Sequence, residues 1–347
     1  MRSFEFESFE EAYPELLKVL LEEGENVSPR GFLTKEITPV GITIKNPRKG
    51  IYYNPLRKAN YGFQIAELLW ILKGSNNLEE IAHYNGQWNN FTDDGITLNG
   101  AYGDRIFNYK SSILTKDENG NENYTPVLVN QFEMAYQQLK KDPDTRQATI
   151  VLFNPGSDFS ETKDKPCTNL MRFMIRNGKL NMTVFMRSND INRGAIYDIP
   201  NFVHIQAIMA SKLGIEMGKY THVADSFHLY ESDFEIAQKL IDNPSSSIYE
   251  GKLMTNLIPS NIVDSELQKI FNIEILTRRI ANIIDLNKIE NMLNEVQSEY
   301  WRSLAAVIAI YNIRKIKRPQ EDVDYLKYLV TNEFSIIIKD WKTLKKD

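Results

Sequence analysis

The sequence has little of several residue types, and each shortage excludes a class of protein. Cys167 is the one cysteine among 347 residues, so no disulfide can form within the chain, and we expect a reducing, intracellular setting. The formal net charge is −5, so the chain lacks the excess of basic residues with which proteins bind a nucleic acid polymer. A few arginines in a cleft would still be enough to bind a small anion. The longest apolar run, Leu304 to Ile310, is too short to cross a bilayer, and the acidic start does not resemble a signal peptide. We therefore expect a cytoplasmic protein that binds neither nucleic acid polymers nor membranes.

Helical and strand patterns alternate in the first two thirds of the chain and give way to helical patterns alone. Hydrophobic residues make up 42% of the chain, enough for one large domain with or without an appendage. We predict an α+β domain over residues 1–242 and a mainly helical C-terminal extension over residues 243–347.

Periodicity and turn residues predict individual elements. The predicted helices are 8–23, the apolar segment 61–73 closed by Gly74, 200–213 beginning at Pro200, a helix from Tyr230, and 265–283, 286–314 and 321–342. The predicted strands are 37–53, broken at Asn46-Pro47, 148–153, 170–175 and 179–186, the last two joined by a tight turn at Asn177-Gly178. Polar surface loops are predicted at 116–124 and 243–247.

Four features suit covalent chemistry on a phosphorylated small molecule. Cys167 can add to an electrophilic carbon where cations favour its thiolate, although a lone cysteine is more often a small buried hydrophobe. Arg187-Ser188 offers a planar guanidinium and a hydroxyl that match phosphate oxygens. Glu67 lies in an apolar helix, where burial raises a carboxyl pKa toward the range of proton transfer.

The fourth feature is the pair His228 and Tyr230, whose side chains share one side of an extended segment. Each feature also has a structural alternative. Arg187 can pair with a core acid, Glu67 can join a structural network, and His228 can be a satisfied core histidine.

Taken together and in order, these residues resemble the thymidylate synthase family, which includes the pyrimidine-nucleotide hydroxymethylases. The resemblance covers roughly residues 10–235. Its motifs are Arg30 in Ser-Pro-Arg-Gly, Ala66 to Gly74, Trp88, Asn99 to Gly103, Asp142 to Gln147, Pro166-Cys167, Arg187 to Asp190, Gly194 to Asp198 and His228 to Tyr230. The resemblance implies an α+β fold whose large mixed sheet forms a homodimer interface, with active sites shared between subunits.

For matched residues the resemblance implies roles. Cys167 would attack C6 of a pyrimidine nucleoside monophosphate and make C5 nucleophilic toward the co-substrate 5,10-methylenetetrahydrofolate; no metal is implied. Glu67 would organise water and move protons, and Tyr102 would lie near the thiol. The implied binding residues are Arg30, Arg187, Ser188 and the partner subunit's Arg146 for the 5′-phosphate, His228 and Tyr230 for the sugar 3′-hydroxyl, and Trp88 and Asp190 for the folate.

Asp198 departs from the synthases, which have an asparagine at this position. A carboxamide complements N3–H and O4 of uracil, whereas a carboxylate accepts from the N4 amine of cytosine and pairs doubly once N3 is protonated. Protonation of N3 also makes C6 electrophilic, so Asp198 would recognise and activate the base, as in the deoxycytidylate hydroxymethylases. Alternatively, Asp198 caps a helix that begins at Pro200.

Other departures bear on the phosphate site and the product. Thr168 replaces the usual histidine after the nucleophile, Gln147 replaces a second arginine, and residues 224–227 differ from the usual segment before His-x-Tyr. The last residues, 341–347, lack the synthases' short apolar tail that closes over folate. Without that lid, water can add where the synthases transfer hydride, and the product carries a hydroxymethyl group.

We therefore hypothesise a folate-dependent hydroxymethyltransferase that acts on dCMP or CMP, in a phage DNA-modification or nucleoside-antibiotic setting. One alternative is a reductive C5-methyltransferase that acts on dUMP or dCMP. The other is a non-catalytic nucleotide-binding relative. His228 and Tyr230 concern the 3′ position of the sugar, so the choice between ribose and deoxyribose stays open.

Overall fold

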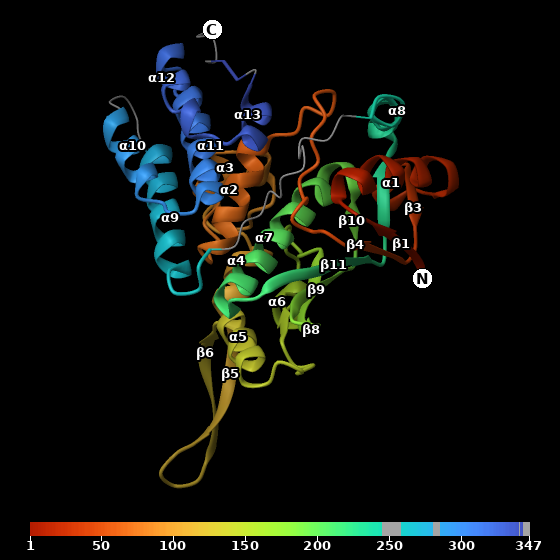
Figure 1. The fold of residues 1–347 in the computed structure, drawn as a ribbon. Helices are drawn as coiled ribbons and strands as arrows, with labels where there is room; N and C mark the ends of the chain where they lie inside the picture. Colours follow the sequence, from red (N-terminus) through yellow and green to blue (C-terminus); the bar gives the residue numbers. More distant parts are fainter. Residues whose placement is uncertain (245–257, 280–284, 340, 343–347) are drawn as a thin grey trace.

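A mixed six-stranded sheet lies at the centre of the computed structural model, which describes residues 1–244, 258–279, 285–339 and 341–342 (Figure 1). In spatial order its strands are β1 (Arg2–Phe6), β4 (Val40–Ile44), β11 (Glu216–Ala224), β9 (Lys179–Met186), β8 (Thr168–Arg176) and β7 (Thr149–Val151). The pairs β1–β4 and β11–β9 are parallel, and the other neighbours are antiparallel. The α+β prediction is confirmed.

The hairpin of β8 and β9 follows its sequence pattern. Asn177 and Gly178 have φ values of 53° and 72°, the left-handed conformation that a two-residue hairpin turn requires. Along β9, Leu180, Met182 and Val184 are fully or almost fully buried, while the residues between them are half-buried. One face of the sheet therefore belongs to the core, and helices cover it.

Two apolar helices pack on this core. The first, α2 (Tyr61–Leu72), ends at the predicted position, because Gly74 at φ 69° takes the left-handed conformation that closes a helix. The second, α7 (Ile196–Leu213), runs across β9 and β11. It begins four residues before the predicted start, because a π-helical turn (Ile191–Ala195) leads into it and Pro200 lies inside. Asp198 therefore lies in the first turn of α7 and does not cap a helix that starts at Pro200, so that alternative is wrong.

Smaller elements surround the core. A second sheet has the order β10 (Asn189–Asp190), β12 (Phe227–Tyr230), β3 (Thr34–Ile37) and β2 (Glu25–Val27). The helices outside the C-terminal extension are α1 (Phe9–Glu23), α3 (Leu78–Ala82), α4 (Tyr102–Phe107), α5 (Gln131–Lys141), α6 (Pro155–Asp158) and α8 (Phe234–Asp242).

Several local predictions were wrong or incomplete. The polar surface loop predicted at 116–124 is present at 117–121, but the strands on either side of it were not predicted. They form a projecting hairpin, β5 (Tyr109–Lys116) and β6 (Glu122–Val129), in which both faces are exposed and the usual alternation is missing (Figure 1). Residues 45–53 form no strand, and the segment from Tyr230 begins with a 3₁₀ turn (Glu231–Asp233). Of the loop predicted at 243–247, residues 245–247 lie outside the described residues.

The C-terminal helices pack on the rest of the protein through contacts with α2 and α7 (Figure 1). They are α9 (Val263–Arg279), α10 (Leu286–Asn294), α11 (Glu299–Lys315), α12 (Gln320–Tyr325) and α13 (Asn332–Ile338). The close approach of α11 requires Gly62, since a Cβ there would lie 2.1 Å from the ring of Tyr311. Buried ion pairs also join the two parts, with Lys73 3.0 Å from Glu274 on α9 and Glu80 on α3 3.4 Å from Arg278 on α9.

The helix predicted over 286–314 is interrupted between α10 and α11 because a side chain from another helix caps the second one. Glu266 on α9 is fully buried, and its carboxylate accepts hydrogen bonds from the backbone N–H groups of Gln297 and Ser298. A negative charge at a helix N-terminus is favourable. The segment 321–342 also divides, at a 3₁₀ turn (Lys327–Leu329), and residues 280–283 and 343–347 lie outside the described residues.

Among the described residues, no helix is both long and apolar enough to span a membrane. In the same residues, no group of three or more histidine, cysteine, aspartate or glutamate side chains converges as a metal site would require.

Candidate active site

Cys167 and Arg187 meet at the open end of the β8–β9 hairpin. The strand register pairs Thr168 with Met186, so the residues just outside this pair lie opposite one another. The backbone N–H of Arg187 donates to the carbonyl of Cys167, and Nη2 of Arg187 lies 3.6 Å from Sγ. The predicted arginine is therefore beside the predicted nucleophile.

The thiol of Cys167 is half-buried, and its pKa lies above the usual value. Burial is the main cause, and the carboxyl groups of Asp198 and Asp164 add to it. Arg187 and Arg30 act in the opposite direction. The cations expected to favour a thiolate are thus present, but burial outweighs them in the free chain.

Two carboxyl groups with raised pKa values lie close to one another, and one of them, Asp198, also acts on this thiol. Burial and the charge of Asp198 raise the pKa of Glu67 to about 8, while a 2.8 Å hydrogen bond from Nδ2 of Asn201 opposes the rise. Burial raises the pKa of Asp198 to about 7. Tyr102 at the start of α4 interacts electrostatically with both Asp198 and the thiol, and burial raises its pKa. Both carboxyl groups can therefore gain or lose a proton near neutral pH.

Asp198 has a partner that the sequence did not reveal. Nδ2 of Asn189, on β10, donates to Oδ2 of Asp198 at 2.7 Å. Oδ1 of Asn189 in turn lies 3.1 Å from Nε2 of His222, whose Nδ1 lies 2.9 Å from the hydroxyl of Tyr220. In the sequence, the one indication of these linked hydrogen bonds is the Tyr-x-His spacing on β11, which places both side chains on one face of the strand.

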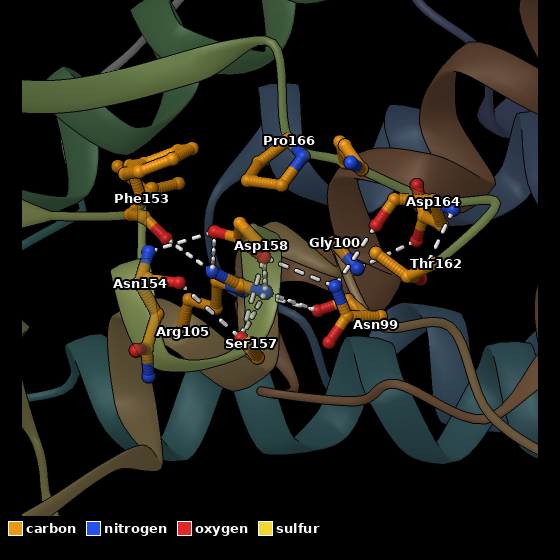
Figure 2. A network of polar contacts seen from close by, with 12 residues as sticks. Asn99, Gly100, Arg105, Phe153, Asn154, Ser157, Asp158, Thr162, Asp164 and Pro166 are labelled. Atoms are coloured by element: carbon orange, nitrogen blue, oxygen red, sulfur yellow. Dashed lines mark hydrogen bonds and ion pairs between the residues drawn. The ribbon is translucent and has the colours of Figure 1, made fainter. Parts of the chain in front are cut away.

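A second polar network holds the loop that leads to the cysteine (Figure 2). The guanidinium of Arg105 donates to both oxygens of Asp158 at 2.7 Å. Nδ2 of Asn99 donates to Oδ1 of Asp158 and to the carbonyl of Asp164, both at 3.0 Å. Oδ2 of Asp164 accepts from the N–H of Gly100 at 2.6 Å, and a Cβ at Gly100 would lie 2.8 Å from Oδ1 of that carboxylate. This network fixes Asp164, three residues before the nucleophile.

The residues predicted to bind phosphate and sugar are partly brought together. Nη2 of Arg30 lies 3.4 Å from the hydroxyl of Tyr230, and the rings of Tyr230 and His228 meet edge to face with centroids 5.3 Å apart. Ser188 is half-buried directly after the arginine beside the thiol. Arg146 is exposed between α5 and β7, and among the described residues no contact joins its side chain to this group.

The residues predicted to face folate lie on two other elements. Trp88 is half-buried in a 3₁₀ turn (Gly86–Asn90) and packs against Trp70 and Phe91, with ring centroids 6.1 and 5.9 Å away. Oδ1 of Asp190 accepts from the backbone N–H groups of Asn192 and Arg193 at 2.7 Å. Its Oδ2 is buried and has no hydrogen-bond partner among the described residues.

Comparison with known proteins agrees with this geometry. A deoxyuridylate hydroxymethyltransferase of Bacillus phage SP01 is 38% identical over 225 residues, which are 64% of this chain and 57% of the relative. A deoxyuridylate hydroxymethyltransferase of Pseudomonas phage M6 is 29% identical over 248 residues, which are 70% of this chain and 65% of the relative. In both cases the match spans less than two thirds of the relative's own length.

The family described as thymidylate synthase matches residues 11–275, a range that reaches from α1 into α9. It includes every motif that converges on the cysteine. The predicted resemblance is confirmed, and the chain belongs to the thymidylate synthase family.

Proposed function

We propose that this protein is a folate-dependent transferase that hydroxymethylates C5 of a pyrimidine nucleoside monophosphate, with dCMP or CMP as substrate. The sulfur of Cys167 bonds to C6, and the electrons of the C5–C6 double bond become available at C5. C5 then bonds the one-carbon unit and loses its proton, the bond between that carbon and its carrier breaks so that tetrahydrofolate leaves, and water adds to the exocyclic carbon as the hydroxyl group. Expulsion of the sulfur restores the double bond and the thiol.

The observation that supports this proposal is the position of Cys167 against Arg187, with Nη2 3.6 Å from Sγ. A guanidinium at this distance can stabilise the developing thiolate by a charge-assisted hydrogen bond. Its Nε and Nη2 donate to the carbonyls of Pro166 and Lys165, so Nη1 is the nitrogen left to bind a phosphate. Family membership supports the same reaction class. It weighs against the non-catalytic alternative, because the nucleophile, this arginine and Glu67 are all retained.

The choice of cytosine rests on Asp198. Burial raises the pKa of its carboxyl group, and one carboxyl oxygen has no hydrogen-bond partner among the described residues. When ionised, that oxygen accepts from the N4 amine of cytosine, whereas O4 of uracil would meet a second acceptor. A base that leaves a buried carboxylate unpaired is disfavoured by a factor of about 10⁴ or more where the site is built around the hydrogen bond.

Uracil is the second candidate base, and two observations favour it. Both relatives are named deoxyuridylate hydroxymethyltransferases. The pKa of Asp198 is about 7, so a large fraction of this carboxyl group is neutral at neutral pH. A neutral carboxyl has one donor and one acceptor, as a carboxamide does, and therefore matches O4 and N3–H of uracil.

The residues present fit a folate co-substrate. Oδ2 of Asp190 is a buried acceptor without a partner among the described residues, which suits an N–H donor of the pterin ring. Trp88 offers a half-buried aromatic face on which a flat ring can stack. The co-substrate 5,10-methylenetetrahydrofolate supplies the one-carbon unit.

We also propose that the enzyme acts as a homodimer across the outer face of the large sheet. Along β9, the side chains of Asn181, Thr183 and Phe185 are only half-buried in the single chain, on the face opposite the core. A partner on this face would supply Arg146 to the phosphate site. Cys167→Ala and Arg146→Ala should each be inactive alone, and mixing the two proteins should restore activity, because a mixed dimer has one complete site. A mixture that stays inactive would contradict the shared site.

Incubation with the folate and dCMP, CMP, dUMP and UMP in parallel, read by product mass, tests the function. We expect addition of a hydroxymethyl group to a cytidine nucleotide, and none with Cys167→Ala. Asp198→Asn should move the preference toward dUMP. If dihydrofolate forms in step with product, the protein is instead the reductive methyltransferase. If the substrate is not consumed and keeps its C5 proton, the protein is a non-catalytic relative. The phage origin of both relatives supports a role in phage DNA modification in a host cytoplasm.

A further inference from the structure

A chain of three buried side chains leads from the centre of the large sheet to Asp198. The chain consists of Tyr220, His222 and Asn189, and they are at most 3% exposed. The three steps measure 2.9, 3.1 and 2.7 Å. Gly194 permits the last step, because a Cβ at this position would lie 2.8 Å from Nδ2 of Asn189.

Tyr220 determines the direction of these hydrogen bonds. Among the described residues, its hydroxyl has no acceptor other than Nδ1 of His222, and a buried O–H without an acceptor is unfavourable. Burial lowers the pKa of His222 to about 3, so its ring is neutral and its single proton lies on Nε2. Nε2 then donates to Oδ1 of Asn189, and the amide NH₂ faces Asp198.

We propose that this chain selects the base, because its donor occupies Oδ2 of Asp198 and leaves Oδ1 to meet the pyrimidine as an acceptor. The inference rests on the proposed function, in which Asp198 contacts the base. An ionised Oδ1 accepts from the N4 amine of cytosine, whereas O4 of uracil needs a donor, which Oδ1 provides only when it is protonated. A hydrogen bond donated to Oδ2 favours the ionised form, so the chain favours cytosine. Tyr220, His222 and Asn189 are positioning residues, since none of them contacts the base.

The charge of Asp198 raises the pKa of each ionisable group around it. These groups are Glu67 on α2, Tyr102 on α4, Cys167 before β8 and Tyr220 on β11. Arg187 contacts the cysteine thiol. Burial raises the pKa of Asp198, and among the described residues the Asn189 amide is the group that lowers it. The amide is therefore well placed to change the protonation of Asp198.

The ratio of kcat/KM for dCMP to that for dUMP, measured in the full-length protein from below to above about pH 7, tests the inference. In the unmodified protein the ratio should rise with pH as Asp198 loses its proton. Asn189→Leu removes the donor, so the ratio at neutral pH should fall about tenfold and its rise should move about one pH unit higher. Tyr220→Phe leaves Asn189 in place and removes only the hydroxyl that fixes the orientation of these hydrogen bonds. It should also lower the ratio at neutral pH, but more weakly.

Tyr300→Phe is a matched control, because it removes the hydroxyl from another buried tyrosine–histidine pair, 2.7 Å from Nε2 of His204. It should change neither the ratio nor its pH profile. If Asn189→Leu and Tyr220→Phe lower both kcat/KM values equally and leave the pH profile in place, the inference is wrong and the chain is only structural. Tyr220→Phe alone decides the question if Asn189→Leu does not fold.

Calorimetric binding of dCMP and dUMP to the same variants in a Cys167→Ala background separates the two proposals. If Asn189→Leu changes the ratio of the dCMP and dUMP binding constants, base selection by Tyr220, His222 and Asn189 is supported even if no C5 product forms with any nucleotide. A ratio that does not shift, in a protein that still makes hydroxymethylated product, contradicts the chain and leaves the proposed function intact.

Discussion

Replacement of Asp158 by alanine should lower the free energy of unfolding by about 3–5 kcal/mol, the range for removing one partner of a buried ion pair. The side chains of Arg105 and Asp158 are 7% and 0% exposed, so water cannot solvate the arginine that remains. The carboxylate accepts two hydrogen bonds from Arg105 at 2.7 Å, one from Asn99 at 3.0 Å and one from the backbone N–H of Asn154 at 2.7 Å. The hydroxyl of Ser157 lies 3.3 Å from Oδ1, and all five hydrogen bonds to this carboxylate are lost together.

Urea denaturation with linear extrapolation measures this loss. Burial alone would raise the pKa of Asp158, but the hydrogen bonds and charge of Arg105 bring it below its ordinary value of 3.8. The stabilisation is therefore present above about pH 4 and disappears as the pH falls through the lowered pKa, so the two proteins should converge in acid. The turnover number should also fall, by about 10²-fold for a 1 Å displacement of the nucleophile's loop.

Two controls make this prediction specific. Glu23 and Arg2 form the same two-pronged pair at 38% and 51% exposure for arginine and glutamate, so Glu23→Ala should change stability far less. Arg105→Met combined with Asp158→Leu should recover much of the lost stability, because apolar side chains of similar volume can replace a buried pair. If Asp158→Ala loses no more stability than Glu23→Ala, the buried network does not hold the loop.

Three further predictions concern other parts of the molecule. Cys167→Ala should abolish turnover and leave the dissociation constant of the nucleotide, measured by calorimetry, within about threefold. Between about pH 4.5 and 8 the folded protein holds a proton on Glu67 that the unfolded chain has lost, so stability falls as the pH rises. Glu67→Gln should flatten this fall, and equal slopes of unfolding free energy against pH in the two proteins would contradict the prediction. Lys73→Met, which removes one cation from the buried carboxylate of Glu274, should lower the free energy of unfolding by about 1–3 kcal/mol, and a thermal shift toward higher stability would contradict it.

The hairpin that brings Cys167 to Arg187 could be predicted because its information is local. Asn177-Gly178 specifies a two-residue turn, and a two-residue turn sets the register of both strands. The cysteine lies ten residues before the turn and the arginine nine residues after it, and a one-residue register shift between Thr168 and Leu170 brings them to the same level. The sequence alone therefore indicates that Cys167 and Arg187 lie close together.

The partners of the carboxyl groups could not be predicted in this way. Asn189 meets His222 from a different strand, 33 residues away, and Arg105 meets Asp158 across 53 residues. Such pairs depend on how the sheet and helices pack, and periodicity along one segment contains no information about it. The projecting hairpin at 109–129 was missed for the opposite reason, since neither of its faces is buried and its strands show no alternation.

The two carboxyl groups of the site explain why such networks are needed elsewhere. Glu67 and Asp198 have pKa values of about 8 and 7, against ordinary values of 4.5 and 3.8, so each makes the fold less stable as the pH approaches neutrality. A fully solvated site would not have this disadvantage, but its acids would hold no proton at neutral pH and could not donate one. The protonation chemistry and the instability thus have the same cause, which is burial. Arg105 with Asp158 offsets it by holding the nucleophile's loop, and Asn189 limits it by donating to Asp198.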